Sequence, residues 1–304
     1  MQEHAICKPV QGTADQRWVI VIGAAFVVCW ASGFVVPRVF VPYAEPLTFV
    51  ALRNAGAVLV LAVLSLGLGA TWPRTVPEVI GLLWAGACLQ GFAVMGLYWA
   101  VYWGLPVGIA ALVGGLQPAL TAMFAVVLLG EKLLAWQWLG IGLGFIGLGL
   151  AVLPNIAATQ TSFVLIVSAL FGVAAMAYGS IYQKRFSDVG DAWSRTTLMF
   201  VGAAIPAAAA TCLFEQGTID WQPALLAVYA WSVLALAVGA TMALLFLMQK
   251  GQAARAAALL YLVPPTSALM AYVAFAEKIT LLQLAGFALS AGGVALVQGA
   301  AEAG

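Results

Sequence analysis

The segment LQPALTAMFAVVLLGEK, Leu116–Lys132, returns in altered form as LVPPTSALMAYVAFAEK, Leu262–Lys278. Each copy is an apolar run with a proline near its start and a Glu-Lys pair at its end. A proline within a helix removes one backbone hydrogen bond and bends or breaks the helix. The chain is therefore predicted to contain the same interrupted apolar helix twice.

The repeat extends beyond these two segments. An offset of 146 residues lays Val107–Val152 on Ala253–Gln298 and leaves 14 of 46 positions identical. Matches of alanine and leucine carry little weight in this composition, but matched Pro, Glu-Lys, Gln and Gly positions are informative. The same offset places Gly33 on Gly179. We expect two homologous halves.

The composition is that of a membrane protein. Of the 304 residues, 64% are hydrophobic and only 8% are charged, whereas soluble domains carry roughly 25% charged residues. The single histidine, His4, lies in a polar tail, and the cysteines lack metal or redox spacing. We therefore predict no catalytic residues, no metal, no cofactor and no enzyme activity. The net charge of +1 gives no indication of a nucleic-acid partner.

Ten apolar segments are long enough to cross a bilayer, which takes about 20 helical residues. Their predicted bounds are Trp18–Val36, Ala44–Leu68, Glu78–Leu97, Val107–Leu129, Leu134–Leu153, Ser162–Tyr182, Arg195–Leu213, Gln222–Leu247, Ala253–Phe275 and Thr280–Gln298. The predicted fold is an all-α integral membrane protein. Its predicted parts are a cytoplasmic tail (1–17), a first repeat of five helices (18–153), a second repeat (162–298) and a C-terminal tail (299–304).

Five helices per repeat is an odd number, so the second repeat must enter the membrane from the opposite side. Positive charges predict the orientation. With a cytoplasmic N-terminus, the outer side holds only Arg38 and Lys278. The inner side then holds Lys8, Arg17, Arg74, Lys132, Lys184, Arg185, Arg195, Lys250 and Arg255. Both termini are therefore predicted to be cytoplasmic.

Inverted repeats are characteristic of secondary transporters, and irregular helices at matched positions point to the binding site. Pro118 and Pro264 are accordingly predicted to bend their helices at membrane depth, either to line a cavity and take part in gating or only to shape the packing. No carboxylate is expected at mid-depth, which favours facilitated transport over proton coupling.

The sequence resembles a known family at these residues. The pattern A-x2-[VL]-x2-L-x-P, followed by [GA]-E-K-x4-Q-x2-G, occurs from Ala110 to Gly140 and again from Ala256 to Gly286. It is similar to the EamA domains of the drug/metabolite transporter superfamily. The resemblance implies a ten-helix carrier whose cavity is lined mainly by helices 1, 3, 4, 6, 8 and 9, with helices 5 and 10 at the periphery or at a subunit contact. Many members export amino acids or other small metabolites.

Polar and aromatic residues in the apolar segments are the candidates for substrate binding. Arg53 is the one clear charge within a span; it either binds a substrate carboxylate or is a structural cation bonded to carbonyl groups. In the third helix Tyr98 and Tyr102 share one face and are expected in the cavity, whereas Trp99 and Trp103 suit the membrane interface. The remaining candidates are Trp30, Gln90, Gln117, Tyr178 and Tyr261, each of which could instead bond helices together.

The resulting prediction is a transporter in a bacterial inner membrane that exports small metabolites, neutral or aromatic amino acids above all, by alternating access. An exporter of drugs or other organic solutes and a passive channel on the same fold are the alternatives. The expected partners are the lipid bilayer and a small-molecule substrate, and the protein is expected to be a monomer or a homodimer.

Overall fold

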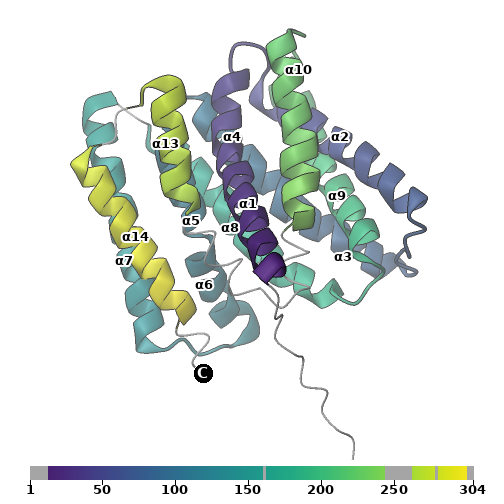
Figure 1. Cartoon of the computed structure of the whole chain (residues 1–304), viewed down its shortest axis with the longest axis horizontal. Coiled ribbons are helices and arrows are strands. Elements are labelled where there is room, and N and C mark those ends of the chain that lie inside the picture. The colour runs from purple at the N-terminus through teal and green to yellow at the C-terminus, as the bar shows by residue number, and fades with distance from the viewer. Residues whose placement is uncertain (1–12, 160–161, 244–261, 278–279, 300–304) are drawn as a thin grey trace, which may run out of the picture.

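The computed structural model describes residues 13–159, 162–243, 262–277 and 280–299, which are almost wholly helical. In the first half the helices are α1 (Thr13–Phe40), α2 (Pro46–Gly67), α3 (Val76–Gly86), the π-helix η1 (Ala87–Phe92), α4 (Ala93–Tyr102), α5 (Val107–Gly115), α6 (Gln117–Leu129) and α7 (Ala135–Thr159). In the second half they are α8 (Phe163–Gln183), the short η2 (Lys184–Phe186), α9 (Ala192–Phe214), α10 (Pro223–Ala230), the π-helix η3 (Trp231–Ala240), α13 (Val263–Phe275) and α14 (Leu281–Gly299). Figure 1 shows them side by side in one bundle.

These helices account for the predicted membrane spans. Among the described residues, eight stretches are long and apolar enough to cross a membrane, and two shorter apolar helices, Val263–Phe275 and Leu281–Leu296, follow them. The third span is continuous from Val76 to Tyr102 and so ends five residues beyond the predicted limit. The first part of the predicted ninth helix lies outside the described residues.

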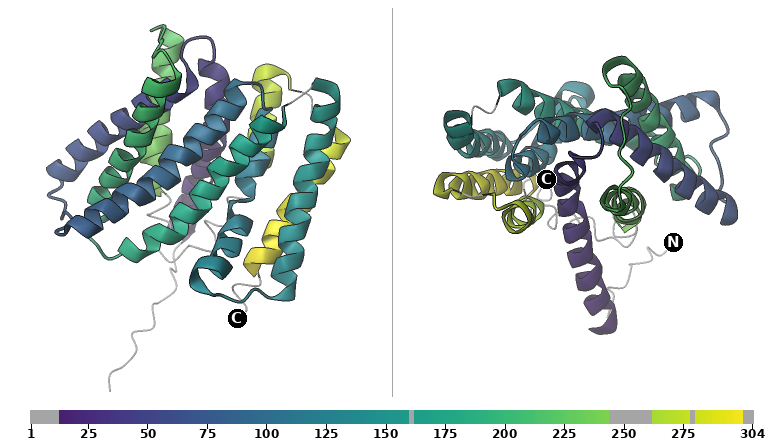
Figure 2. Two further views of the ribbon diagram at one scale, coloured as in Figure 1. Left: turned by 180° about the vertical axis from the view of Figure 1, so that it is seen from behind. Right: turned by 90° about the horizontal axis from the view of Figure 1, so that it is seen from above.

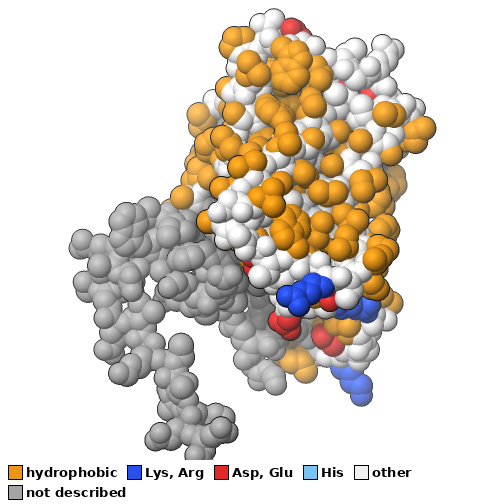
Figure 3. Space-filling model, turned by 90° about the vertical axis from the view of Figure 1, so that its right-hand side faces the viewer, with side chains coloured by type: hydrophobic (Ala, Val, Ile, Leu, Met, Phe, Trp, Pro, Cys, Tyr) orange, Lys and Arg blue, Asp and Glu red, His pale blue; other side chains and the backbone are white. Residues whose placement is uncertain are grey.

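The outer surface is suited to lipid. Leu59, Val63 and Leu66 on α2 are each about 70% exposed, which would be unfavourable in water but is expected against acyl chains. On the face drawn in Figure 3, the Lys and Arg side chains gather at the lower end below an apolar band. The protein is therefore an all-α, multi-pass membrane protein.

The predicted interruption of the fourth helix is a break of one residue. Leu116 lies between α5 and α6 with φ −78° and ψ −5°, and Leu262 precedes α13 with nearly the same angles, −81° and −12°. Pro118 and Pro264 then stand in the first turn of α6 and α13, where the missing N–H removes no intrahelical bond. The repeated proline thus marks the start of a helix in each half.

The recurring Glu-Lys and Gln residues belong to a matched pair of helix ends. Gly130 and Ala276 are both left-handed, and the next amide in each copy bonds back to Ala125 or Ala271. This hydrogen-bond pattern closes the last turn of a helix. Gln137 and Gln283 then accept from the backbone N–H three residues earlier, at the starts of α7 and α14. The recurrence therefore has a structural cause.

One prediction follows from this matched turn. Ala276 is the one non-glycine residue with positive φ in the described part of the chain, and that conformation costs an L-residue about 1–2 kcal/mol. We expect Ala276→Gly to stabilise the protein by about 1 kcal/mol and Gly130→Ala to destabilise it by a similar amount. Thermal unfolding in detergent would measure both; equal Tm values for the two variants would contradict the assignment.

A second matched pair holds α2 against α9. Glu45 precedes α2 and accepts from the backbone N–H of Thr218, 2.9 Å away, in the loop after α9. Asp191, which is 146 residues later, precedes α9 and accepts from the N–H of Thr71, 2.9 Å away, in the loop after α2. The bond from Thr218 lowers the pKa of Glu45. Burial alone would raise the pKa of Asp191, but hydrogen bonds from Ser194, Thr71 and Trp193 outweigh it and lower that pKa. The helix pair is thus bound at both ends.

The π-helices also recur. An offset of 146 carries η1 (Ala87–Phe92) onto residues 233–238, which lie inside η3 (Trp231–Ala240). π-Helical turns are rare and occur frequently at functional sites. The third and eighth spans therefore both contain a π-helical segment, which their amino-acid sequences did not predict.

The glycine-rich helices α7 and α14 pack directly on each other, as Figures 1 and 2 show. A Cβ on Gly147 would lie 2.6 Å from the carbonyl oxygen of Gly286, and one on Gly293 would clash with the carbonyl of Gly140. Gly140 corresponds to Gly286 and Gly147 to Gly293 in the repeat. The two contacts are consequently related by the approximate two-fold axis that relates the halves.

Candidate functional site

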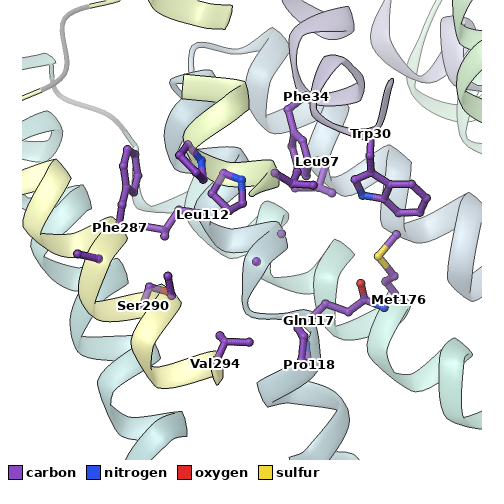
Figure 4. A pocket seen from close by; sticks show the side chains of 17 residues that line it. Trp30, Phe34, Leu97, Leu112, Gln117, Pro118, Met176, Phe287, Ser290 and Val294 are labelled. Atoms are coloured by element: carbon purple, nitrogen blue, oxygen red, sulfur yellow. The ribbon is translucent and has the colours of Figure 1, made fainter. Parts of the chain in front are cut away.

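A cavity with two chambers lies among the helices of both halves. The larger chamber has a volume of about 230 Å³ and the smaller one about 80 Å³. Both are lined by Trp30, Phe34, Leu97 and Met176, so these four side chains stand at their junction. Figure 4 shows Trp30 and Met176 on one side of the larger chamber and Phe287, Ser290 and Val294 on the other.

The cavity lies on the axis that relates the two halves. Trp30 corresponds to Met176 under the offset of 146, and both line both chambers. Three further pairs share a chamber: Gln117 with Val263 and Pro118 with Pro264 in the larger, and Gln90 with Leu236 in the smaller. A site formed by corresponding positions of two inverted repeats is the arrangement that secondary transporters use.

The two halves contribute different chemistry. In the pairs above, the first half supplies an indole and two amides, whereas the second half supplies a thioether and two aliphatic groups. Arg53 and Tyr98 add to the polar side of the smaller chamber. The cavity therefore has a polar wall and an apolar wall, which suits a solute with a polar group at one end and an apolar body.

Arg53 is the distinctive residue of the smaller chamber. Its side chain is 5% exposed, and its Nη1 donates to Asn54 Oδ1 over 3.0 Å. The guanidinium carbon lies 5.9 Å from the centre of the Phe200 ring. Its Nε donates to no group of the described residues. A buried cation is thus presented to the cavity with part of its hydrogen-bonding capacity unused.

Helix α5 ends at the larger chamber, which Gly114 and Gly115 line. Because Pro118 has no N–H, it cannot bond the carbonyl of Gly114 four residues earlier. The N–H of Leu116 bonds to this carbonyl instead, so the carbonyl keeps a partner within the chain.

Most of the predicted binding residues come together here. Trp30, Arg53, Gln90, Tyr98 and Gln117 all line one or both chambers. Their contact with a substrate stays a prediction. Tyr261 lies outside the described residues.

Two predicted residues do not line either chamber. Tyr102 lies in a separate outer hollow with Glu45 and Asp220. Tyr178 instead stacks on Tyr182, with ring centres 6.0 Å apart, and meets Phe124 edge-on. It is two residues from Met176 and so about 200° around α8 from the residue that does face the cavity.

The structure corrects one implication of the family resemblance, because the tenth helix is not peripheral to the cavity. The α14 residues Phe287, Ser290 and Val294 form a wall of the larger chamber. Sequence analysis did not identify them, or Phe34 and Met176. For Met176 a signal was present, because the repeat offset carries Trp30 onto it.

On the predicted outer side, loops of both halves close over the bundle. Ala44 and Ile219 form an antiparallel bridge, and Glu215 accepts from the N–H groups of Leu47 and Thr48 at 2.9 and 2.7 Å. Glu277 takes backbone hydrogen bonds at the start of α5. Burial raises the pKa of the Glu277 carboxyl, although Arg38 and those backbone groups oppose the shift.

An inverted helical repeat around an axial cavity defines a membrane transporter of small solutes. The chain belongs to the EamA-like transporter family, which matches residues 17–153 and again residues 163–298. This family is part of the drug/metabolite transporter superfamily. The match covers both halves of the chain, and the predicted family is confirmed.

Individual proteins agree with this assignment. The chain is 25% identical to an uncharacterized transporter, YvbV, of Bacillus subtilis over 90% of its own length and 89% of that protein. It is 28% identical to the protein PecM of Dickeya dadantii over 57% of its own length and 54% of that chain. A crystal structure of another protein, 20% identical, superposes with a TM-score of 0.64 over 93% of this chain and 97% of that one.

Proposed function

We propose that this protein exports small amphipathic metabolites, neutral or aromatic amino acids among them, across a bacterial inner membrane by alternating access, with both termini in the cytoplasm. The observation that carries the proposal is the cavity on the repeat axis, lined at four corresponding pairs of positions. Two halves of the same fold and opposite orientation can exchange conformations, so that one side closes while the other opens.

The size and chemistry of the cavity support a metabolite-sized solute. Pockets for drug-sized ligands have volumes of about 300–1,000 Å³, whereas the larger chamber here has about 230 Å³. An aromatic or branched side chain fits among Phe34, Leu112 and Phe287, which are lining residues. The polar end of the same solute would lie toward Arg53 and Gln90.

Transport by purified protein in proteoliposomes tests the proposal. We expect saturable uptake of labelled aromatic and aliphatic amino acids, acceleration by unlabelled substrate on the opposite side, and little uptake of cationic amino acids. We also expect no response to a pH gradient, because no Asp or Glu of the described residues lines either chamber. Flux without saturation or counterflow would indicate a channel. No flux of any amino acid would eliminate this substrate class.

The apolar wall of the larger chamber favours a second candidate, an exporter of neutral organic solutes such as drugs. In that case the substrates would not need a carboxyl or amino group. Uptake of uncharged aromatic compounds that is not inhibited by amino acids would support this second function.

A further inference from the structure

We infer that Arg53 binds the carboxylate of the transported solute, so that the substrates are carboxylic acids and amines without a carboxylate are not transported. This inference rests on the proposed function and specifies the substrate class of the same cavity. Solutes that carry a carboxylate are then substrates, and solutes without one are not.

Charge balance supports the inference first. An isolated cation in a low-dielectric interior is strongly unfavourable unless it is paired. Arg53 is 5% exposed, yet no acidic residue from the described ranges lines its chamber or the adjoining one. A bound carboxylate supplies the missing charge, and a solute with only a positive charge is repelled.

The hydrogen bonds around Arg53 support it next. Asn54 holds Nη1 at 3.0 Å and is itself fixed by a bond from its Nδ2 to the Ala203 carbonyl at 3.3 Å. Phe200 packs against the guanidinium. Nε is left without an acceptor in the part of the chain that the structure describes. The guanidinium of Arg53 is therefore held in place, and its Nε–H remains available to donate a hydrogen bond. Its planar, fork-shaped geometry matches the two oxygens of a carboxylate.

The repeat indicates that the fold does not require arginine here. The residue corresponding to Arg53 in the second half is Met199 on α9. Methionine is of similar length and uncharged, so the same helix position is occupied there without a cation. The charge in the first half is accordingly a specific feature of that half, which also supplies Gln90 and Tyr98 to the smaller chamber.

A structural role and a binding role for Arg53 predict opposite changes in Tm when the arginine is replaced by methionine. If the guanidinium served mainly to bond helices together, Arg53→Met would leave acceptors unpaired and lower Tm. If it is a binding group held unpaired in the empty site, Arg53→Met removes an unfavourable buried charge and raises Tm by a few degrees. Stability gained at the expense of function is typical of binding residues. Thermal unfolding in detergent distinguishes the two.

Three aromatic compounds test the substrate class on wild-type protein: 3-phenylpropionate, phenylalanine and 2-phenylethylamine. We expect the two acids to raise Tm in a saturable way and the amine to have no effect. In Arg53→Met the apparent affinity for both acids should fall at least about tenfold, because a hydrogen-bonded charge is lost. Arg38→Met, which removes an exposed arginine outside both chambers, should retain wild-type binding.

The outcomes separate this inference from the proposed function. Equal binding of the amine and the acids, no binding of either acid, unchanged acid binding in Arg53→Met, or a lowered Tm in that variant would each overturn the carboxylate assignment. Acid binding that depends on Arg53, but without counterflow in proteoliposomes, would support the carboxylate assignment and contradict the transporter mechanism. Counterflow of the amine would retain a transporter and eliminate the role of Arg53.

Discussion

Replacing Gly286 by leucine is expected to destabilise the protein by more than about 3 kcal/mol, because α14 then cannot approach α7. A Cβ at Gly286 would lie 2.5 Å from the carbonyl oxygen of Gly147 and 2.9 Å from the amide nitrogen of Ala151. Both neighbours are backbone atoms that cannot move aside without displacing a helix. Even one added methylene in a well-packed interior costs roughly 1–3 kcal/mol.

The two helices also offer matched controls. Nothing lies within 4 Å of a Cβ placed on Gly292 of α14 or on Gly149 of α7. Leucine at either control position should change the stability by less than about 0.5 kcal/mol. Gly147→Leu should have the same large effect as Gly286→Leu, since the contact is mutual. Thermal unfolding in detergent would measure all four, and wild-type stability of Gly286→Leu would refute the close contact.

The repeat is the feature of the sequence that predicted most of the fold. The offset between Pro118 and Pro264 indicated where a helix begins in each half, and the structure adds that Leu116 and Leu262 take nearly the same backbone angles there. These backbone conformations are determined locally, since proline lacks an N–H donor whatever its surroundings. The same offset pairs the π-helices η1 and η3 and the cavity residues Trp30 and Met176, although residue identity does not reveal either pair.

The positions of the other site residues depend on their depth in the membrane and on the adjacent helices. The pattern of residues along one helix does not contain this information. Tyr98 and Tyr102 share a helix face and were both expected in the cavity, but only Tyr98 lines a chamber. Four residues carry Tyr102 about 6 Å further along the axis, into the hollow near Glu45 and away from the cavity. The resemblance likewise placed the tenth helix at the periphery, whereas its residues Phe287 and Val294 form a wall of the larger chamber.

Tryptophan in place of Met176 is expected to reduce transport at least about a hundredfold without unfolding the protein. Met176 stands at the junction of the two chambers, of about 80 and 230 Å³. An indole there would take up space between Arg53, the proposed carboxylate site, and the apolar side chains of the larger chamber. Under the proposed function one solute occupies both chambers, and a loss of about 3 kcal/mol in binding or in the transport step corresponds to this factor.

The control is on the same helix. Tyr178 is two residues further and packs on Tyr182 and Phe124 outside both chambers. Tyr178→Trp exchanges one aromatic ring for a larger one, so both variants add bulk to α8, but only the first adds it to the cavity. Initial rates of counterflow in proteoliposomes, with the protein amount and Tm of each variant measured in parallel, would compare them. Equal loss in both variants would mean that bulk on α8 is harmful in itself. Retained transport in Met176→Trp would move the solute path away from the axis of the repeat, where Trp30 and Met176 line both chambers.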